Sequence, residues 1–98
     1  MVAGGSLFTA EPDAFEQMDH LILNEAELTL PEFVADLTKG CAKRIYTADG
    51  YPDMRESPVP LWDLIQMRRY ASLNIQYSRG CHFNCEFCNI TALFGRTP

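Results

Sequence analysis

Three cysteines near the C-terminal end of the chain form its clearest chemical pattern. Cys81, Cys85 and Cys88 have the spacing C-x-x-x-C-x-x-C. Thiolates are soft ligands that suit iron–sulfur clusters, zinc and copper(I). Steps of four and three residues can bring three sulfur atoms together on one short loop. The pattern therefore predicts a metal centre with thiolate ligands.

The number of cysteines in this run indicates which kind of centre to expect. A [4Fe–4S] cluster needs four external ligands, so three thiolates leave one iron without a protein sulfur. An open position is typical of a reactive metal centre, whereas a structural site is normally closed. We therefore expect a cluster whose fourth iron is open to a small molecule.

The residues on either side of the cysteines predict the elements that position them. Between Leu73 and Tyr77, apolar and polar residues alternate, which is the pattern of a half-buried strand. Gly80 supplies the backbone freedom for a sharp turn after that strand. A helix is expected from about Asn89. The cysteines would then lie on a loop between the C-terminal end of a strand and a helix.

This segment resembles the signature of the radical S-adenosylmethionine enzymes, which have the same cysteine spacing. The resemblance implies that Cys81, Cys85 and Cys88 hold a [4Fe–4S] cluster, and that S-adenosylmethionine binds the fourth iron through its amino and carboxylate groups. One electron from the reduced cluster would then cleave a carbon–sulfur bond and give a 5′-deoxyadenosyl radical. Phe87 matches the family's aromatic position, which implies that it packs near the cluster and the adenine.

Further residues resemble the branch of that family with a cobalamin-binding domain ahead of the barrel. The lead-in Ser78-Arg79-Gly80 is typical of this branch. Gly4-Gly5 corresponds to a Gly-Gly turn of the cobalamin-binding domain, although a turn without a ligand explains it equally well. The loop 24–27 corresponds to a Gly-Glu-x-Glu-like loop, with Asn24 in place of glycine. Asparagine also adopts the left-handed backbone, so a tight turn is still expected. The sequence leaves open whether the intact protein binds cobalamin.

Two other features of this region have simpler explanations than chemistry. His20 lacks the Asp-x-His-x-x-Gly spacing of an axial cobalt ligand and is expected to be a strand residue. Glu25 and Glu27 could act as general acid and base. Acidic residues are also favoured ahead of a helix by its dipole, and that is our interpretation.

Other uses of the cysteines remain alternatives. A non-catalytic zinc or other metal-binding interaction module could combine the three thiolates with His82 or with Cys41, although zinc sites more often show two paired elements. Cys85 and Cys88 could form a redox pair, which would leave Cys81 unexplained. Structural disulfides would require an oxidising compartment, and nothing marks the chain as secreted.

The first half of the chain has the pattern of alternating strands and helices. Strands are expected at Val2-Ala3, at 20–23 and at 43–47, and a helix over 12–18. A second helix is expected to begin at Thr29, which can form a capping box with Glu32, and to end at Gly40. Asp49-Gly50 suggests a hairpin-type turn.

These elements predict a small α/β protein with short strands and two or three helices. By resemblance, residues 1–40 would be the C-terminal part of a Rossmann-like cobalamin-binding domain and 41–71 a proline-rich linker. Residues 72–98 would begin the radical S-adenosylmethionine barrel. We therefore expect a fragment without catalytic activity of its own. The intact enzyme would act on a small-molecule substrate, which the sequence does not identify, and would need an electron donor.

Composition excludes some classes of partner. The 98 residues carry a net charge of −5, which argues against nucleic acid as a partner. The apolar runs are too short to span a membrane, and the first residues lack the features of a signal peptide. We expect a cytoplasmic protein, and the sequence leaves its oligomeric state open.

Overall fold

A parallel sheet organises the first half of the chain. In the computed structural model, which describes residues 1–96, the sheet contains three strands in the order β1 (Val2–Gly4), β2 (His20–Ile22) and β3 (Ile45–Tyr46). Both strand pairs are parallel. Parallel neighbours require a crossover connection, most often helical, and helices follow β1 and β2. The α/β class predicted from the sequence is confirmed.

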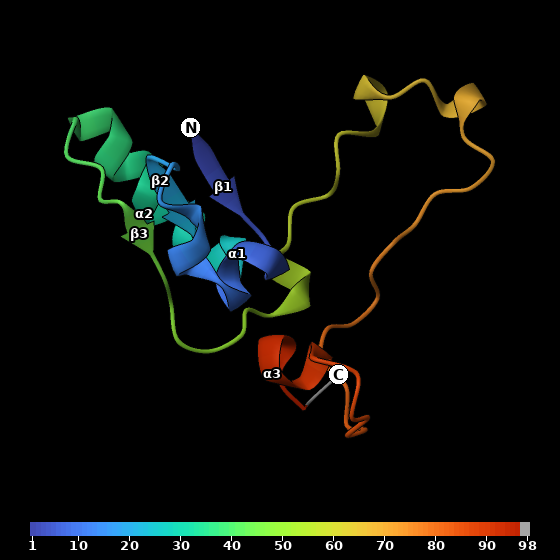
Figure 1. The fold of residues 1–98 in the computed structure, drawn as a ribbon. Coiled ribbons are helices and arrows are strands. Elements are labelled where there is room, and N and C mark those ends of the chain that lie inside the picture. Colours follow the sequence, from blue (N-terminus) through green and yellow to red (C-terminus); the bar gives the residue numbers. More distant parts are fainter. Residues whose placement is uncertain (97–98) are drawn as a thin grey trace.

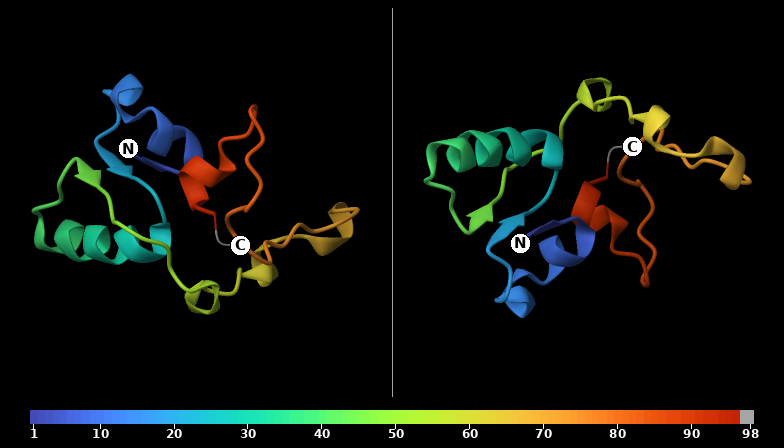
Figure 2. Two further views of the ribbon diagram at one scale, coloured as in Figure 1. Left: turned by 90° about the horizontal axis from the view of Figure 1, so that it is seen from below. Right: turned by 90° about the horizontal axis from the view of Figure 1, so that it is seen from above.

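Helices lie on both sides of this sheet. The short helix α1 (Ser6–Ala10) and the longer α2 (Ala26–Lys39) lie on opposite sides of it (Figure 2). A third helix, α3 (Ile90–Phe94), lies close to α1, although residues 11–89 separate them along the chain (Figure 1). The cysteine segment is thereby brought back to the edge of the sheet where β1 and β2 end.

The core lies between the sheet and α2. Ile22, Phe33 and Tyr46 are buried together, and the rings of Phe33 and Tyr46 meet edge to face at 5.4 Å. The Tyr46 hydroxyl accepts a hydrogen bond from the Lys43 amide at 2.8 Å and donates one to Asp36 at 3.0 Å. Burial raises the pKa of Tyr46, so this phenol stays neutral and keeps both bonds.

The start of α2 corrects one prediction. The helix begins at Ala26, so the capping box predicted for Thr29 and Glu32 is wrong. The Thr29 side chain is buried within the first turns and donates to the Glu25 carbonyl at 3.1 Å. Glu25 and Glu27, which stand at this earlier start, both contact a residue far along the chain. Gly40 ends the helix in the left-handed conformation, with φ of 72°, as predicted.

Shorter elements also differ from the prediction. The helix predicted over 12–18 is a single 3₁₀ turn at Pro12–Phe15, and α1 was not predicted. Gly50 has a φ of 96°, but β3 pairs only in parallel among residues 1–96, so the turn at Asp49-Gly50 closes no hairpin there. Further 3₁₀ turns follow at Met54–Glu56, Trp62–Leu64 and Met67–Arg69.

The strand predicted at 73–77 is absent from the structure. This segment belongs to an arm, about residues 58–76, that loops away from the sheet before the chain returns (Figure 1). Ile75 and Tyr77 are 80% and 93% exposed. A strand needs a neighbouring strand for its N–H and C=O groups, and within residues 1–96 none pairs with this segment. The alternation of apolar and polar residues alone was not sufficient to predict a strand.

The domain boundaries remain a prediction. β3 lies within the segment 41–71 that the sequence assigns to a linker, and it hydrogen-bonds to β2 in the same sheet. None of the helices formed by residues 1–96 has the length and apolar character needed to cross a bilayer.

Candidate functional site

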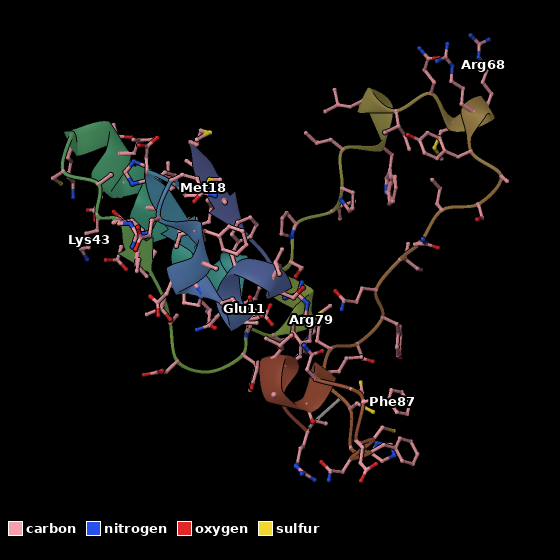
Figure 3. The ribbon with its side chains drawn as sticks, viewed as in Figure 1. Glu11, Met18, Lys43, Arg68, Arg79 and Phe87 are labelled. Atoms are coloured by element: carbon pink, nitrogen blue, oxygen red, sulfur yellow. The ribbon has the colours of Figure 1, made fainter. Side chains whose placement is uncertain are left out.

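A buried ion cluster joins the cysteine segment to the α/β layer. The Arg79 guanidinium donates through Nη2 to Glu27 Oε1 at 2.7 Å and through Nη1 to Glu27 Oε2 at 3.1 Å. Nη1 also donates to Glu25 Oε2. The side chains of Arg79, Glu25 and Glu27 are 20%, 6% and 13% exposed. We call these residues the Arg79 cluster; Figure 3 shows Arg79 between the α/β layer and α3.

The end of β2 places both carboxylates. Asn24 turns the chain with φ of 60°, the left-handed conformation expected for it. Its side-chain amide donates to the Thr47 hydroxyl at 2.8 Å and to the Ala48 carbonyl at 3.0 Å, which fixes the turn against the chain after β3. Glu25 then precedes α2 and Glu27 lies in its first turn. Both carboxylates therefore lie at the positive end of the helix dipole.

The electrostatics of Glu27 follow from its contacts. Hydrogen bonds from Arg79 lower the pKa of the Glu27 carboxyl from 4.5 to about 2, against the opposing effect of burial. The Ser57 hydroxyl also donates to this carboxylate. The same contacts raise the pKa of Arg79 above its ordinary value. Glu27 is therefore ionised at neutral pH and serves as the ion-pair partner of Arg79.

The cysteine loop begins directly after the cluster. Gly80 turns the chain with φ of 84°, and the Cys81 amide donates to the Gly95 carbonyl at 3.1 Å. The Cys88 amide donates to the Cys85 carbonyl at 3.1 Å, which closes a turn inside the motif. The predicted helix follows as α3. The loop therefore has ordered hydrogen bonds at both ends.

All three thiols of this loop are free. Cys81 and Cys88 are half-buried and Cys85 is exposed. As the chain is placed in the structure, no group of three or more His, Cys, Asp or Glu side chains within residues 1–96 is arranged to hold a metal ion. Three free thiols on one loop have the donor chemistry of an iron–sulfur ligand set. Their assignment as ligands stays a prediction.

The aromatic neighbours of the thiols are turned to solvent. Phe87 is 93% exposed and projects from the loop (Figure 3). The rings of His82 and Phe83 lie 4.2 Å apart. The contact of Phe87 with a cofactor, which the resemblance implies, stays a prediction. Its exposure leaves the ring available to a ligand.

Among the other candidate ligands, His82 lies within the loop and Cys41 lies outside it. Cys41 directly follows the end of α2, and its thiol contacts the Asp36 carbonyl at 3.6 Å. His20 is a residue of β2, as predicted. Its Nδ1 donates to the Lys43 carbonyl at 2.7 Å and its ring lies 5.2 Å from that of Phe33.

A cleft of about 1080 Å³ lies at the edge of the α/β layer. Gly4 and Gly5 line it together with Leu93 and Phe94 of α3, whereas none of the three loop cysteines does. Glu25 and Arg79 also line it. The cleft therefore combines apolar walls with a charged pair, as small-molecule sites commonly do.

Sequence reasoning missed the Arg79 cluster. Arg79 was recognised only as part of the lead-in to the cysteines, and Glu25 and Glu27 only as residues favoured by the helix dipole. More than 50 residues separate the partners, and no local pattern reports such a contact. The available signal was a basic residue directly ahead of the cysteines and an acidic pair at the end of a strand.

The chain is similar to part of several proteins named as methyltransferases or methylthiotransferases. It is 43% identical over its whole length to an uncharacterized methyltransferase of Synechocystis, and 33% identical over 97% of its length to hopanoid C-2 methylase of Rhodopseudomonas palustris. It is also 33% identical over 82% of its length to a putative methylthiotransferase of Methanocaldococcus jannaschii.

The similarity covers only part of these relatives. The chain spans 19%, 19% and 20% of their respective lengths. No protein-family model matches the chain, and no solved structure gives a significant match. The relatives are methyltransferases and a methylthiotransferase by name.

Proposed function

We propose that this chain is the cluster-binding part of a radical S-adenosylmethionine enzyme. Cys81, Cys85 and Cys88 would hold a [4Fe–4S] cluster, and the reaction of the intact enzyme would attach a methyl or methylthio group to an organic substrate. The observation that carries the proposal is the C-x-x-x-C-x-x-C spacing of three free thiols on one loop. The names of the relatives support the reaction class.

The chain's own residues have distinct parts in this proposal. The three thiolates bind iron and leave the fourth position to the amino and carboxylate groups of S-adenosylmethionine. The cluster, when bound, supplies the single electron that starts the reaction. Gly80 turns the chain into the loop. Phe87, which is exposed on the loop, would cover the bound cofactor.

The cleft supports a second element of the proposal. An organic cofactor or substrate held there would lie against the end of β1, beside Arg79 and α3. Cobalamin is the cofactor that the resemblance suggests for the intact enzyme. The glycine turn at the end of β1 leaves room for a ligand, because nothing lies within 4 Å of a Cβ built on Gly5.

Anaerobic reconstitution with iron and sulfide tests the proposal. We expect about four irons per chain, a brown protein, and an electron paramagnetic resonance spectrum that changes when S-adenosylmethionine is added. Cys85→Ala should abolish the spectral change, and the matched control Cys41→Ala should retain it, since Cys41 lies at the far end of α2. One tightly bound zinc with no response to S-adenosylmethionine would instead indicate a zinc-binding module, and the proposal would fail.

A further inference from the structure

The Arg79 cluster is a long-range connection to the cysteine segment. Arg79 is two residues before Cys81, whereas Glu25 and Glu27 stand at the start of α2, 54 and 52 residues earlier. The preceding arm makes no strand, and its Ile75 and Tyr77 side chains are exposed. The chain therefore returns from solvent and becomes fixed to the α/β layer at Arg79, immediately before the cysteine loop.

The charges in the cluster make this connection strong. One guanidinium faces two carboxylates, and its fork satisfies both oxygens of Glu27. Glu25 Oε1 is buried and has no hydrogen-bond partner among residues 1–96. Without Arg79, two largely buried carboxylates would lose their ion-pair partner, which is strongly unfavourable. The ion pairs of Arg79 with Glu25 and Glu27 therefore hold the start of the cysteine loop to the α/β layer.

A second arginine, Arg55, forms an exposed and local ion pair, unlike the buried Arg79 cluster. Arg55 pairs with Asp53 at 2.6 Å, two residues away, and its side chain is 90% exposed. Such a surface pair contributes little and joins no separate segments. Arg55 therefore provides a matched control for Arg79.

We infer that Arg79 is a positioning residue: the hold of Glu25 and Glu27 on its guanidinium fixes the start of the loop of Cys81, Cys85 and Cys88 to the N-terminal end of α2. The inference rests on the proposed function only for the statement that the loop binds an iron–sulfur cluster. The placement of the loop can be measured without any metal.

The test is the rate at which each thiol of the metal-free chain is alkylated, followed by mass spectrometry. In Arg79→Ala, the half-buried Cys81 and Cys88 should react roughly tenfold faster than in the unaltered chain, because a segment released from a buried ion pair opens more often. Cys41 should keep its rate. Arg55→Ala should change none of these rates.

Two conservative variants protect the test against simple misfolding. Arg79→Lys keeps one charge but not the fork, so its rates should fall between those of the unaltered chain and Arg79→Ala. Glu27→Gln keeps the shape of the side chain and removes its charge, and it should accelerate Cys81 and Cys88 in the same direction. If circular dichroism shows that Arg79→Ala has lost its helix, Glu27→Gln decides the outcome.

Two results would overturn the inference. One is an unchanged rate at Cys81 and Cys88 in Glu27→Gln and in a folded Arg79→Ala. The other is an equal acceleration at Cys41, which would indicate general loosening of the chain. These outcomes are separate from the reconstitution experiment. Faster labelling with no cluster assembly would leave Arg79 as a positioning residue and refute the proposed function. If an iron–sulfur cluster assembles but the substitutions leave the labelling rates unchanged, the proposed function is supported and the positioning role of Arg79 is refuted.

Discussion

The pKa of Glu27 gives a quantitative check on the Arg79 cluster. In the folded chain this carboxyl should titrate at about 2, compared with its ordinary value of 4.5, chiefly because Arg79 hydrogen-bonds to its charged form. Arg79→Ala removes that bond and leaves burial, which raises the pKa, against the weaker lowering effect of the Ser57 hydroxyl and a backbone hydrogen bond. The midpoint of Glu27 should then rise from about 2 toward its ordinary value of 4.5.

The size of the Glu27 pKa shift gives the contribution of this carboxylate to the stability of the folded chain. The difference between 4.5 and about 2 corresponds to about 3 kcal/mol, at about 1.4 kcal/mol per pH unit. Because the folded pKa is lowered, this stabilisation is fully present above about pH 4.5 and is lost as pH falls from there toward about 2. By the same relation, about 2 kcal/mol should be lost between pH 7 and pH 3.

Carbon-detected nuclear magnetic resonance of the glutamate carboxyls measures the midpoint directly, and Glu27→Gln identifies the signal. Urea unfolding at pH 7 and pH 3 measures the linked stability. The unaltered chain should lose about 2 kcal/mol more on acidification than Glu27→Gln does. Arg55→Ala is the control, and it should leave the Glu27 midpoint where it is.

One result would refute this reasoning. If Glu27 titrates near 4.5 while circular dichroism still reports an intact α2, then Arg79 does not hold the carboxylate in solution. The inference about the cysteine loop would then lose its physical basis as well, because both depend on the same contact.

Two further substitutions test how the layer beneath the site is built. Gly4→Ala should destabilise the chain by about 1–3 kcal/mol in urea unfolding, because its Cβ would lie 2.7 Å from the Ile22 carbonyl oxygen on the paired strand; an unaltered midpoint would show that β1 and β2 are not so closely paired. Tyr46→Phe should cost about 1–3 kcal/mol, because it leaves the Lys43 amide and Asp36 without their shared hydroxyl; an unaltered unfolding midpoint would show that these two hydrogen bonds do not stabilise the chain.

The sequence predicted the parts of the fold that depend on local rules. The run from His20 to Leu23 is short, apolar and followed by a turn, and its residues Leu21 to Leu23 are buried at the centre of the sheet. Gly40 ends α2 because glycine adopts the left-handed backbone without strain. Asn24 adopts the same conformation for a related reason. Each of these depends on the residue itself and its nearest neighbours.

Two predictions failed where contacts with distant residues matter. The strand at 73–77 needed a neighbour that residues 1–96 do not supply. The start of α2 was placed at Thr29 because a capping box is a local pattern. The helix actually begins one turn earlier, where contacts with Arg79 hold Glu25 and Glu27.

The same distinction separates the two halves of the candidate site. The cysteine spacing is a local pattern, so the sequence could assign a chemistry to it. The ion cluster beside it depends on three charged residues that meet only after the chain has formed the sheet, left it as the arm and returned. Because an unpaired buried carboxylate is costly, Glu25 and Glu27 require the segment that carries Arg79 to come back to this edge. The acidic pair therefore acts on the cysteine loop through the fold, at a position where the sequence showed only a favourable start for a helix.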